Sequence, residues 1–462
     1  MDSALPRDKV GLFRLTWQAM GAVSPAADVA YLITGVALFA LGATPLSILL
    51  GIVAYLFIMN TSYQFSKYVN SAGSYYTFVG KSIGGAFATF QGWNMVFYVT
   101  LGYSGFGFLG LASFLTLINP AYSGDIYWIP IVLIATTVSF LFTYFGIRLA
   151  TSYQVLGGLL EVGVLLVGAI ALIVAAGHNN TLAVFTTQFV PGGIKQVLFS
   201  MIYSVVLYFG TALSITSLAE ETTEPKKNVR KALLTTVLIA GATMLIVSYA
   251  MTVKWGSASM ASFASSPDPG LILFKGVSYI LYLLLLIFTV NSFMGYNVAV
   301  SSANARNFYA FARDGVIMPK SLTAVHKKYG SPYKSAILIY VVAIIVSLGF
   351  GLAFGPFVGG LMMLFANGYA AYLEHILASI GLPFLAKKNG SFSMVYHLIV
   401  PIIGIAILLA ILVSTIYPTL PAYPFNYAVY VGIAWLGVSV LLTYIEMKLH
   451  KENVKKAGQW SL

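Results

Sequence analysis

The sequence predicts an all-α protein that crosses a membrane many times, and its composition and hydropathy are the observations that predict this. Of 462 residues, 59% are apolar and only 8% are charged, whereas soluble domains carry roughly 25% charged residues. The mean hydropathy is +0.87. Apolar stretches of roughly 20 residues recur along the chain, and a helix of that length crosses about 30 Å of hydrocarbon. We therefore expect a polytopic membrane protein with about 12 transmembrane helices.

Each candidate span is an apolar stretch between polar or charged turns. The approximate limits are 14–40, 44–66, 88–118, 126–146, 150–176, 196–218, 231–254, 271–300, 334–354, 357–381, 396–417 and 425–447. These spans leave no room for a sizeable soluble domain. Residues 1–13 and 448–462 remain as tails outside the membrane.

The basic residues predict the orientation of the spans. If residues 1–13 are cytoplasmic, only Lys195, Lys254 and Lys275 of the 25 lysines and arginines lie on or near the outer side. Short cytoplasmic loops are enriched in Lys and Arg, so we expect both tails in the cytoplasm and the protein in the cytoplasmic membrane. The net charge of +12 then faces anionic lipid headgroups, and no nucleic-acid partner is expected. The charged stretches within 221–231 and 448–456 are expected to be solvated.

Patterns typical of catalysis or metal binding do not occur. The chain has no cysteine, and its five histidines show no paired spacing, so we expect neither a disulfide nor a metal centre. No Gly-Asp pair or Ser-His arrangement lies within adjacent spans, as an intramembrane hydrolase would need. We expect no enzymatic activity and no cofactor.

Two interruptions by small residues stand out within the spans. Pro25 lies in "MGAVSPAAD" of span 1, and "LYFGTALS" occupies 207–214 of span 6. Proline removes a backbone hydrogen bond, which in lipid must be replaced by other partners. If spans 1–5 (14–176) and 6–10 (196–381) are two inverted halves, the interruptions match in position, as at the midplane site of a transporter. The alternative is that Pro and Gly merely kink these helices.

Three motifs resemble those of the amino acid–polyamine–organocation transporters. They are "SAGSYYTFVGKSIGGAFATFQGW" after span 2, "AEETTEPKKNVRKAL" after span 6 and "SSANARNFYAFARDGVIMPKSL" after span 8. They occur in the family's order and spacing, and the resemblance covers spans 1–10 well and spans 11–12 loosely. The matching residues are Gly73, Tyr75, Tyr76, Gly84, Gly92, Trp93, Glu220, Glu221, Pro225, Lys227, Asn228, Val229, Arg230, Arg306, Tyr309, Arg313, Asp314, Gly315 and Pro319.

The resemblance implies a LeuT-type fold. Its transport core, 14–381, would be a 5+5 inverted repeat with spans 1 and 6 unwound at the substrate, and spans 11–12 (396–447) would be two peripheral helices. It also implies secondary active transport of amino acids by alternating access, with proton coupling or exchange. A carrier of polyamines or small amines is the alternative within transport, and a transporter-like nutrient receptor or a channel is the alternative of another class.

The interruptions predict how a small-molecule amino acid or amine substrate is held. Free N–H groups at the start of a half-helix suit a carboxylate, and carbonyls at the end of one suit an ammonium. Tyr98 and Tyr103 of span 3 are candidates to close over the substrate; the alternative is ordinary aromatic packing in a chain with 30 tyrosines. Asn291 and Asn297 of span 8 are further candidates. The expected main-chain contacts are Ala22, Val23, Ser24, Ala26, Ala27, Phe209, Gly210, Thr211 and Ala212.

Acidic residues within spans are rare and usually functional. Glu161 lies 13 residues beyond Arg148 in span 5, roughly 20 Å along a helix and so near mid-membrane. The resemblance places the lysine of some proton-coupled relatives at this position. We expect Glu161 to bind the coupling ion, H⁺ or else Na⁺; the alternative is a neutral acid bonded to a carbonyl of a broken helix.

Two further acids remain with open or lesser roles. Asp28, three residues after Pro25, either binds a cationic group of the substrate or caps the helix that Pro25 begins. Glu374 with His375 in span 10 is expected at the inner membrane interface, because Lys387 follows in the same helix.

Overall fold

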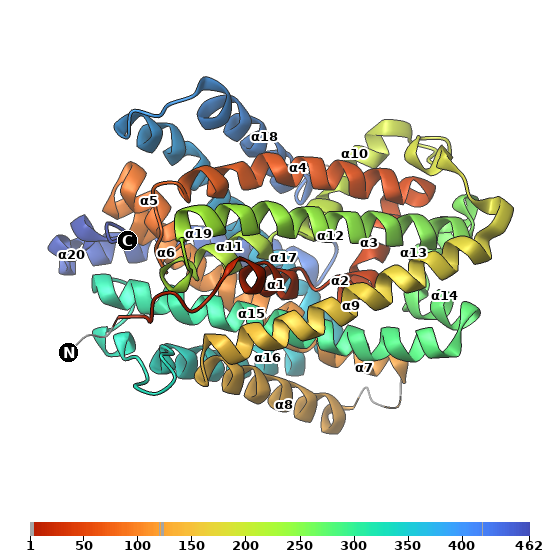
Figure 1. The fold of residues 1–462 in the computed structure, drawn as a ribbon, viewed down its shortest axis with the longest axis horizontal. Coiled ribbons are helices and arrows are strands. Elements are labelled where there is room, and N and C mark those ends of the chain that lie inside the picture. The colour runs from red at the N-terminus through yellow and green to blue at the C-terminus, as the bar shows by residue number, and fades with distance from the viewer. Residues whose placement is uncertain (1–3, 120, 122–123, 418) are drawn as a thin grey trace.

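The computed structural model describes residues 4–119, 121, 124–417 and 419–462. The described chain is built from helices, and its β-structure is limited to one isolated bridge between Val10 and Thr222. Figure 1 shows the long helices side by side along the longest axis of the molecule. The predicted all-α fold is confirmed.

Eleven stretches of the described chain are long and apolar enough to span a membrane, which agrees with a multi-pass membrane protein. The expected first span is not among them as a single helix, because it is interrupted. Its second half is continuous with the following helix in the stretch Ile33–Phe65. The other stretches are Gly85–Thr116, Asp125–Tyr144, Ile147–Asn179, Gly193–Thr216, Pro225–Trp255, Tyr279–Asp314, Tyr333–Phe354, Pro356–Lys388, Val395–Ser414 and Phe425–Leu449.

Helical segments of three kinds make up the described chain. The α-helices are α1 (Leu12–Val23), α2 (Pro25–Ala27), α3 (Ile33–Ala40), α4 (Thr44–Phe65), α5 (Tyr75–Ile83), α6 (Gly85–Gly102), α7 (Gly110–Ile118), α8 (Asp125–Tyr144), α9 (Ile147–Ala176), α10 (Gly193–Val206), α11 (Gly210–Thr216), α12 (Pro225–Trp255), α13 (Met260–Ala264), α14 (Pro269–Val277), α15 (Tyr279–Asp314), α16 (Tyr333–Phe354), α17 (Pro356–Lys388), α18 (Val400–Ser414), α19 (Phe425–Leu449) and α20 (Lys451–Lys456). The π-helical segments are η1 (Asp28–Leu32), η3 (Tyr103–Leu109) and η10 (Val395–Ile399). The short 3₁₀ segments are η2 (Leu41–Ala43), η5 (Gly177–Asn179), η6 (Leu182–Phe185), η7 (Ala219–Glu221), η8 (Ser257–Ser259) and η9 (Lys320–Thr323).

Both predicted helix interruptions are present. α1 ends at Val23, and Ser24 adopts a left-handed conformation with φ 57° and ψ 60° before Pro25 opens α2. A residue before proline is disfavoured in the α-helical region, so the sequence itself explains where α1 stops. In the second interruption, α10 ends at Val206 and α11 begins at Gly210.

The interrupted helices lie inside the bundle. α1 packs against α9, α11, α12 and α15, and α2 packs against α9 and α15. Figure 1 places α1, α2 and α11 in the middle of the molecule, with α8 and α18 at its periphery. The two breaks are therefore enclosed by other helices.

Residues 4–10 and 451–462 lie at the same end of the bundle, the left end in Figure 1. The stretch 448–462 differs from the solvated tail that was expected, because Val454 and Ala457 are buried against the bundle. The basic side chains of this stretch stay exposed, as do Leu449, Trp460 and Leu462, whereas Val454 and Ala457 pack like core residues.

The stretch 221–231 also departs from the expectation of a solvated loop. Glu221 is buried and forms an ion pair with Arg306 of α15, whose guanidinium also donates to the carbonyl of Ser302. A buried charge is tolerated when it is paired and hydrogen-bonded. The charge at the start of this stretch is therefore structural, whereas the charged residues Glu224, Lys226, Lys227 and Lys231 further along it are exposed.

Candidate functional site

Glu161 of α9 joins the first helix break to α15. Its Oε1 accepts a hydrogen bond from the backbone N–H of Ala26 at 2.8 Å and one from the hydroxyl of Ser292 at 2.7 Å. Its Oε2 accepts one from Nδ2 of Asn291 at 3.1 Å. The hydroxyl of Ser292 in turn accepts the N–H of Ala27 at 3.1 Å. The buried carboxylate and this hydroxyl thus satisfy two N–H groups at the start of α2.

The sequence of α9 explains how the carboxylate reaches the break. Gln154, Gly157 and Glu161 are buried and share one helix face, since they are three and four residues apart. A side chain at Gly157 would collide with Asn291, because an added Cβ would lie 2.9 Å from its Oδ1. The absence of a side chain here lets α9 and α15 approach closely enough for Glu161 to meet Ala26.

Gln154, one to two turns before Glu161 in α9, also takes part in the contact between α9 and α15. Its Nε2 donates to the carbonyl of Gly295 at 2.6 Å. A Cβ on Gly21 would overlap Oε1 of Gln154, so glycine is needed where α1 crosses this side chain. Gln154 therefore holds α1 and α15 together one turn before the break.

The two breaks touch each other. A Cβ on Gly210, the first residue of α11, would lie 2.5 Å from the carbonyl oxygen of Ala22 near the end of α1. Ala22, Val23 and Ser24 are buried, as are Phe209, Thr211 and Ala212. The structure thus brings together the main-chain positions that were expected from the sequence, although it holds no substrate that would test their role.

Aromatic side chains surround the second break. The ring centroid of Phe209 lies 5.8 Å from that of Tyr55, 5.3 Å from that of Tyr372 and 5.0 Å from that of His375. Tyr98 belongs to the same surroundings, with Glu374 and Tyr372 among its polar neighbours. This wall is mainly aromatic, and its polar groups are the tyrosine hydroxyls, the imidazole of His375 and the carboxyl of Glu374.

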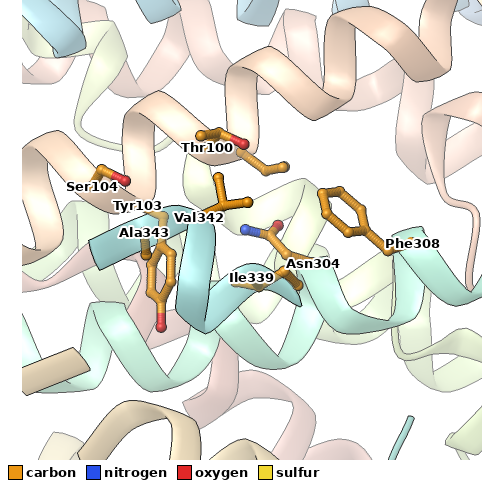
Figure 2. Close-up of a pocket in the computed structure, with 9 residues that line it drawn as sticks. Thr100, Tyr103, Ser104, Asn304, Phe308, Ile339, Val342 and Ala343 are labelled. Carbon is orange, nitrogen blue, oxygen red and sulfur yellow. The ribbon is translucent and has the colours of Figure 1, made fainter. Parts of the chain in front are cut away.

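Tyr103 lies elsewhere. Its hydroxyl bonds to Ser139 of α8 at 2.8 Å, and its ring packs edge-on against Phe108. Figure 2 shows the small cavity that Tyr103 lines, between α6, α15 and α16, with the amide of Asn304 beside it. Both amide atoms of Asn304 lack a hydrogen-bond partner among the described residues. Tyr103 thus borders a separate cavity, and Tyr98 alone of the two tyrosines lies beside the break.

Asp28 does not cap α2 in this structure. Glu161 and Ser292 accept the N–H groups at the start of α2, and Oδ2 of Asp28 has no hydrogen-bond partner among the described residues. Asp28 is 1% exposed. A buried carboxylate oxygen without a partner is costly, so a bound group that donates a hydrogen bond to Asp28 would be favoured.

Comparison with known proteins identifies the family. The family model described as amino acid permease matches residues 14–457. The chain belongs to the amino acid permease family. It is also 26% identical over 354 residues, 72% of this chain and 72% of the relative, to the branched-chain amino acid permease BcaP of Bacillus subtilis (strain 168). This permease is therefore a transporter of amino acids rather than an enzyme, and the resemblance to the wider transporter family is confirmed.

Several polar residues of the site were not expected from the sequence. Ser292 bridges Glu161 and Ala27, and the hydroxyl of Tyr153 donates to Oδ1 of Asn291 at 2.9 Å. Neither residue differs by sequence pattern from the other serines and tyrosines of this permease. Asn291 and its neighbours form one cluster because they surround the carboxyl of Glu161, which lies 130 residues from Asn291 along the chain. The sequence gives no sign of this contact.

The Glu374–His375 pair differs from what was expected, while Asn297 has a partner in η3 and stays a predicted substrate contact. Asn297 donates to the carbonyl of Gly107 at 3.1 Å and so supports the π-helical segment η3. Glu374 and His375 are buried inside α17, where His375 contacts Phe209 and bonds the hydroxyl of Tyr75 at 3.0 Å. The contact with Phe209 places the pair at the level of the second break. From there α17 continues for more than three turns before it ends at Lys388.

Proposed function

We propose that this permease is a secondary active transporter that carries amino acids across the cytoplasmic membrane by alternating access, driven by H⁺. In this proposal the main-chain groups at the breaks after Val23 and Val206 hold the substrate, and both tails are cytoplasmic. The two halves, 14–176 and 196–381, form the inverted repeat, with 396–447 outside it. The observation that carries the proposal is the Glu161 carboxylate bound to the start of α2.

The coupling between proton binding and substrate binding depends on the directions of the hydrogen bonds around Glu161. The N–H of Ala26 and Nδ2 of Asn291 can only donate. The hydroxyl of Ser292 accepts from Ala27, so its own hydrogen is directed to Glu161. All three partners therefore suit an ionised carboxylate, and protonation of Glu161 turns one of its acceptor positions into a donor. A proton on Glu161 thus weakens its hold on α2.

The substrate carboxylate then competes with Glu161 for the same N–H groups. The start of α2 offers N–H groups that suit one anion. While Glu161 is ionised it occupies them. Once it is protonated, the substrate carboxylate takes the N–H groups of Ala26 and Ala27, so that a substrate and a proton bind together. When the site opens to the other side of the membrane, Glu161 releases its proton. The ionised carboxylate then takes back the N–H groups of α2, and the substrate leaves.

The surroundings of the second break favour a neutral substrate with an apolar side chain. Phe209, Tyr55 and Tyr372 present ring faces there, and Ala212 is small and buried. An apolar side chain gains free energy by leaving water for such a wall. The name of the Bacillus relative, a branched-chain amino acid permease, points to the same class of substrate.

Asp28 supports a role in holding the cationic group. Its unpartnered Oδ2 would accept a hydrogen bond from the substrate ammonium while α2 binds the carboxylate. The same oxygen favours the second candidate function, a carrier of small amines, since an amine needs only the cationic subsite.

Uptake into proteoliposomes tests the proposal. Purified protein is reconstituted and given a panel of labelled amino acids and polyamines under imposed pH or sodium gradients. We expect an inward proton gradient to drive accumulation of leucine, isoleucine or valine. Accumulation of polyamines alone would favour the second candidate. Neither uptake nor exchange of any panel member by intact, oriented protein would overturn both.

A further inference from the structure

Residues 451–462 form a strap across the end of the bundle where both tails lie. Asn453 donates from Nδ2 to the carbonyl of Gly315 at 2.9 Å. The backbone N–H of Gly458 donates to Asp314 at 2.7 Å, and Gln459 donates to the carbonyl of Gly80 at 2.6 Å. The strap thus contacts the end of α15 and the turn between α5 and α6.

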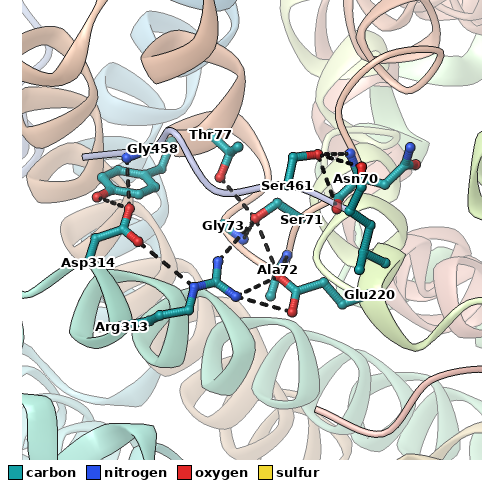
Figure 3. A network of polar contacts seen from close by, with 12 residues as sticks. Asn70, Ser71, Ala72, Gly73, Thr77, Glu220, Arg313, Asp314, Gly458 and Ser461 are labelled. Carbon is teal, nitrogen blue, oxygen red and sulfur yellow. Dashed lines mark hydrogen bonds and ion pairs between the residues drawn. The ribbon is translucent and has the colours of Figure 1, made fainter. Parts of the chain in front are cut away.

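The strap then reaches the loop between α4 and α5. The hydroxyl of Ser461 accepts the backbone N–H of Asn70 at 2.9 Å, and the N–H of Leu462 donates to the carbonyl of Asn70 at 3.1 Å. Figure 3 shows the strap passing over the polar network formed by residues 70–77, Glu220, Arg313 and Asp314. Segments that are far apart in the sequence are therefore joined through residues 453–462.

The receiving surface is shaped for the strap. A Cβ on Gly85 would overlap the carbonyl oxygen of Val454, and one on Gly80 would lie 2.7 Å from that of Ala457. Gly458 has φ +67°, and a Cβ there would lie 2.8 Å from the carbonyl oxygen of Tyr76. Backbone meets backbone at each of these points, so the contact is close-packed and not a loose tail lying on a surface.

Trp460 covers the ion pair beneath the strap. Its ring lies 3.7 Å from Cζ of Arg313, whose Nη1 donates to both oxygens of Glu220 at 3.0 and 3.2 Å. Glu220 also accepts the backbone N–H of Ala72 at 2.7 Å. An aromatic face over a guanidinium is attractive, and excluding water strengthens the charge pair below it. Trp460 therefore stabilises the contact between Glu220 and Arg313.

That ion pair connects the strap to the second helix break. Glu220 follows the end of α11 by four residues, and α11 begins at the break. Arg313 belongs to the last turn of α15, the helix that carries Ser292 and Asn291 of the site. To open the bundle at this end, α11 must move away from α15, which breaks the Glu220–Arg313 contact and uncovers Trp460.

We propose that residues 451–462 are a latch that holds this end of the bundle closed and must release in each transport cycle. The proposal rests on the alternating access proposed above. The strap lies at the end that the charge distribution assigns to the cytoplasm, so the latch sets how readily the cytoplasmic side of the permease opens.

Cysteine labelling measures opening without any substrate. The chain has no cysteine, so Ala19→Cys on the buried inner half of α1 gives a single reporter. In this background, Trp460→Ala is expected to raise the rate of labelling by a water-soluble maleimide roughly two- to fivefold, since a partly exposed cation–π contact is lost. Trp460→Phe, which keeps a ring face, should raise it less. Lys455→Ala, on the exposed side of α20, should leave it unchanged.

A covalent lock tests release in the functional protein. In the double variant Asn70→Cys with Ser461→Cys, oxidation joins the strap to the loop between α4 and α5. We expect the oxidised protein to lose uptake and exchange, and a reductant to restore both. Uptake that is equally fast before and after reduction would overturn the latch, and so would unchanged labelling of Ala19→Cys in the Trp460→Ala variant. If the unmodified protein carries no substrate at all, the proposed function fails while the labelling result still decides the latch.

Discussion

Replacing Glu161 by glutamine is expected to uncouple transport from the proton gradient. The carboxamide keeps the volume and one acceptor oxygen, so the N–H of Ala26 and the hydroxyl of Ser292 retain a partner. Its amide nitrogen then faces Nδ2 of Asn291, which donates to the native carboxylate. One hydrogen bond to a charged acceptor is lost, which costs roughly 1.5–3 kcal/mol, and the side chain no longer binds a proton.

The size of the effect follows from the driving force. One pH unit corresponds to about 1.36 kcal/mol, so a carrier that moves one proton per substrate at zero membrane potential accumulates up to about tenfold per unit. We expect the native protein to approach this limit with labelled leucine in proteoliposomes whose potential is clamped at zero. The Glu161→Gln variant should only equilibrate the substrate, while its exchange rate stays within about threefold of the native rate.

A matched variant separates coupling from general damage. Glu224→Gln removes an acid whose side chain is 67% exposed and lies outside the bundle, and it should accumulate leucine like the native protein. Accumulation by Glu161→Gln to the native level would refute the coupling role. Loss of exchange together with accumulation would refute the competition between Glu161 and the substrate, because the neutral carboxamide is a weaker acceptor than a carboxylate and should yield the N–H groups of α2 to the substrate.

Three further predictions concern single residues. Asp28→Asn should raise the KM for leucine at least about tenfold without lowering the melting temperature; a lower melting temperature with an unchanged KM would instead indicate a structural cap. Gly210→Ala should slow exchange about tenfold or more, because its Cβ meets the backbone of Ala22 at 2.5 Å; a native rate would show that the breaks are not in fixed contact. Burial raises the pKa of Asp268, in the turn before α14, from 3.8 to about 6, so its ionised form opposes folding and stability falls as the pH rises between these values. Asp268→Asn should therefore stabilise the detergent-solubilised protein by about 1 kcal/mol at pH 7, after allowance for partial exposure, and not at pH 4; equal shifts in melting temperature at both pH values would contradict this.

The sequence was sufficient to predict features that depend on local chemistry. Pro25 removes a backbone hydrogen bond and disfavours the helical conformation at Ser24, so the first break could be placed within a residue or two. The depth of Glu161 follows from its count of residues beyond Arg148. The apolar spans follow from composition alone, because only helices and closed barrels satisfy the backbone within lipid.

Partners that come from distant parts of the chain could not be predicted. Ser292 meets Glu161 only because α9 and α15 cross at Gly157, and the sequence of one chain does not record that crossing. The same holds for the strap. Its lysines are typical of a solvated tail, whereas the close packing of Val454 and Gly458 depends on α5 and the start of α6, which lie beneath them. The depth of Glu374 was misjudged because the length of α17 beyond it was underestimated.

The ring of donors around Glu161 also bears on which cation the permease can use. A sodium ion is held by several converging oxygen lone pairs, as hard cations in proteins generally are. Here the oxygens of Glu161 meet hydrogens from Ala26, Ser292 and Asn291, and the side-chain oxygen of Asn291 is itself occupied by the hydroxyl of Tyr153. A proton needs only one lone pair of Glu161, whereas a metal cation would have to compete with several of these donors at once. Ion selectivity in this permease would then depend on the direction of its hydrogen bonds and not on the size of a cavity.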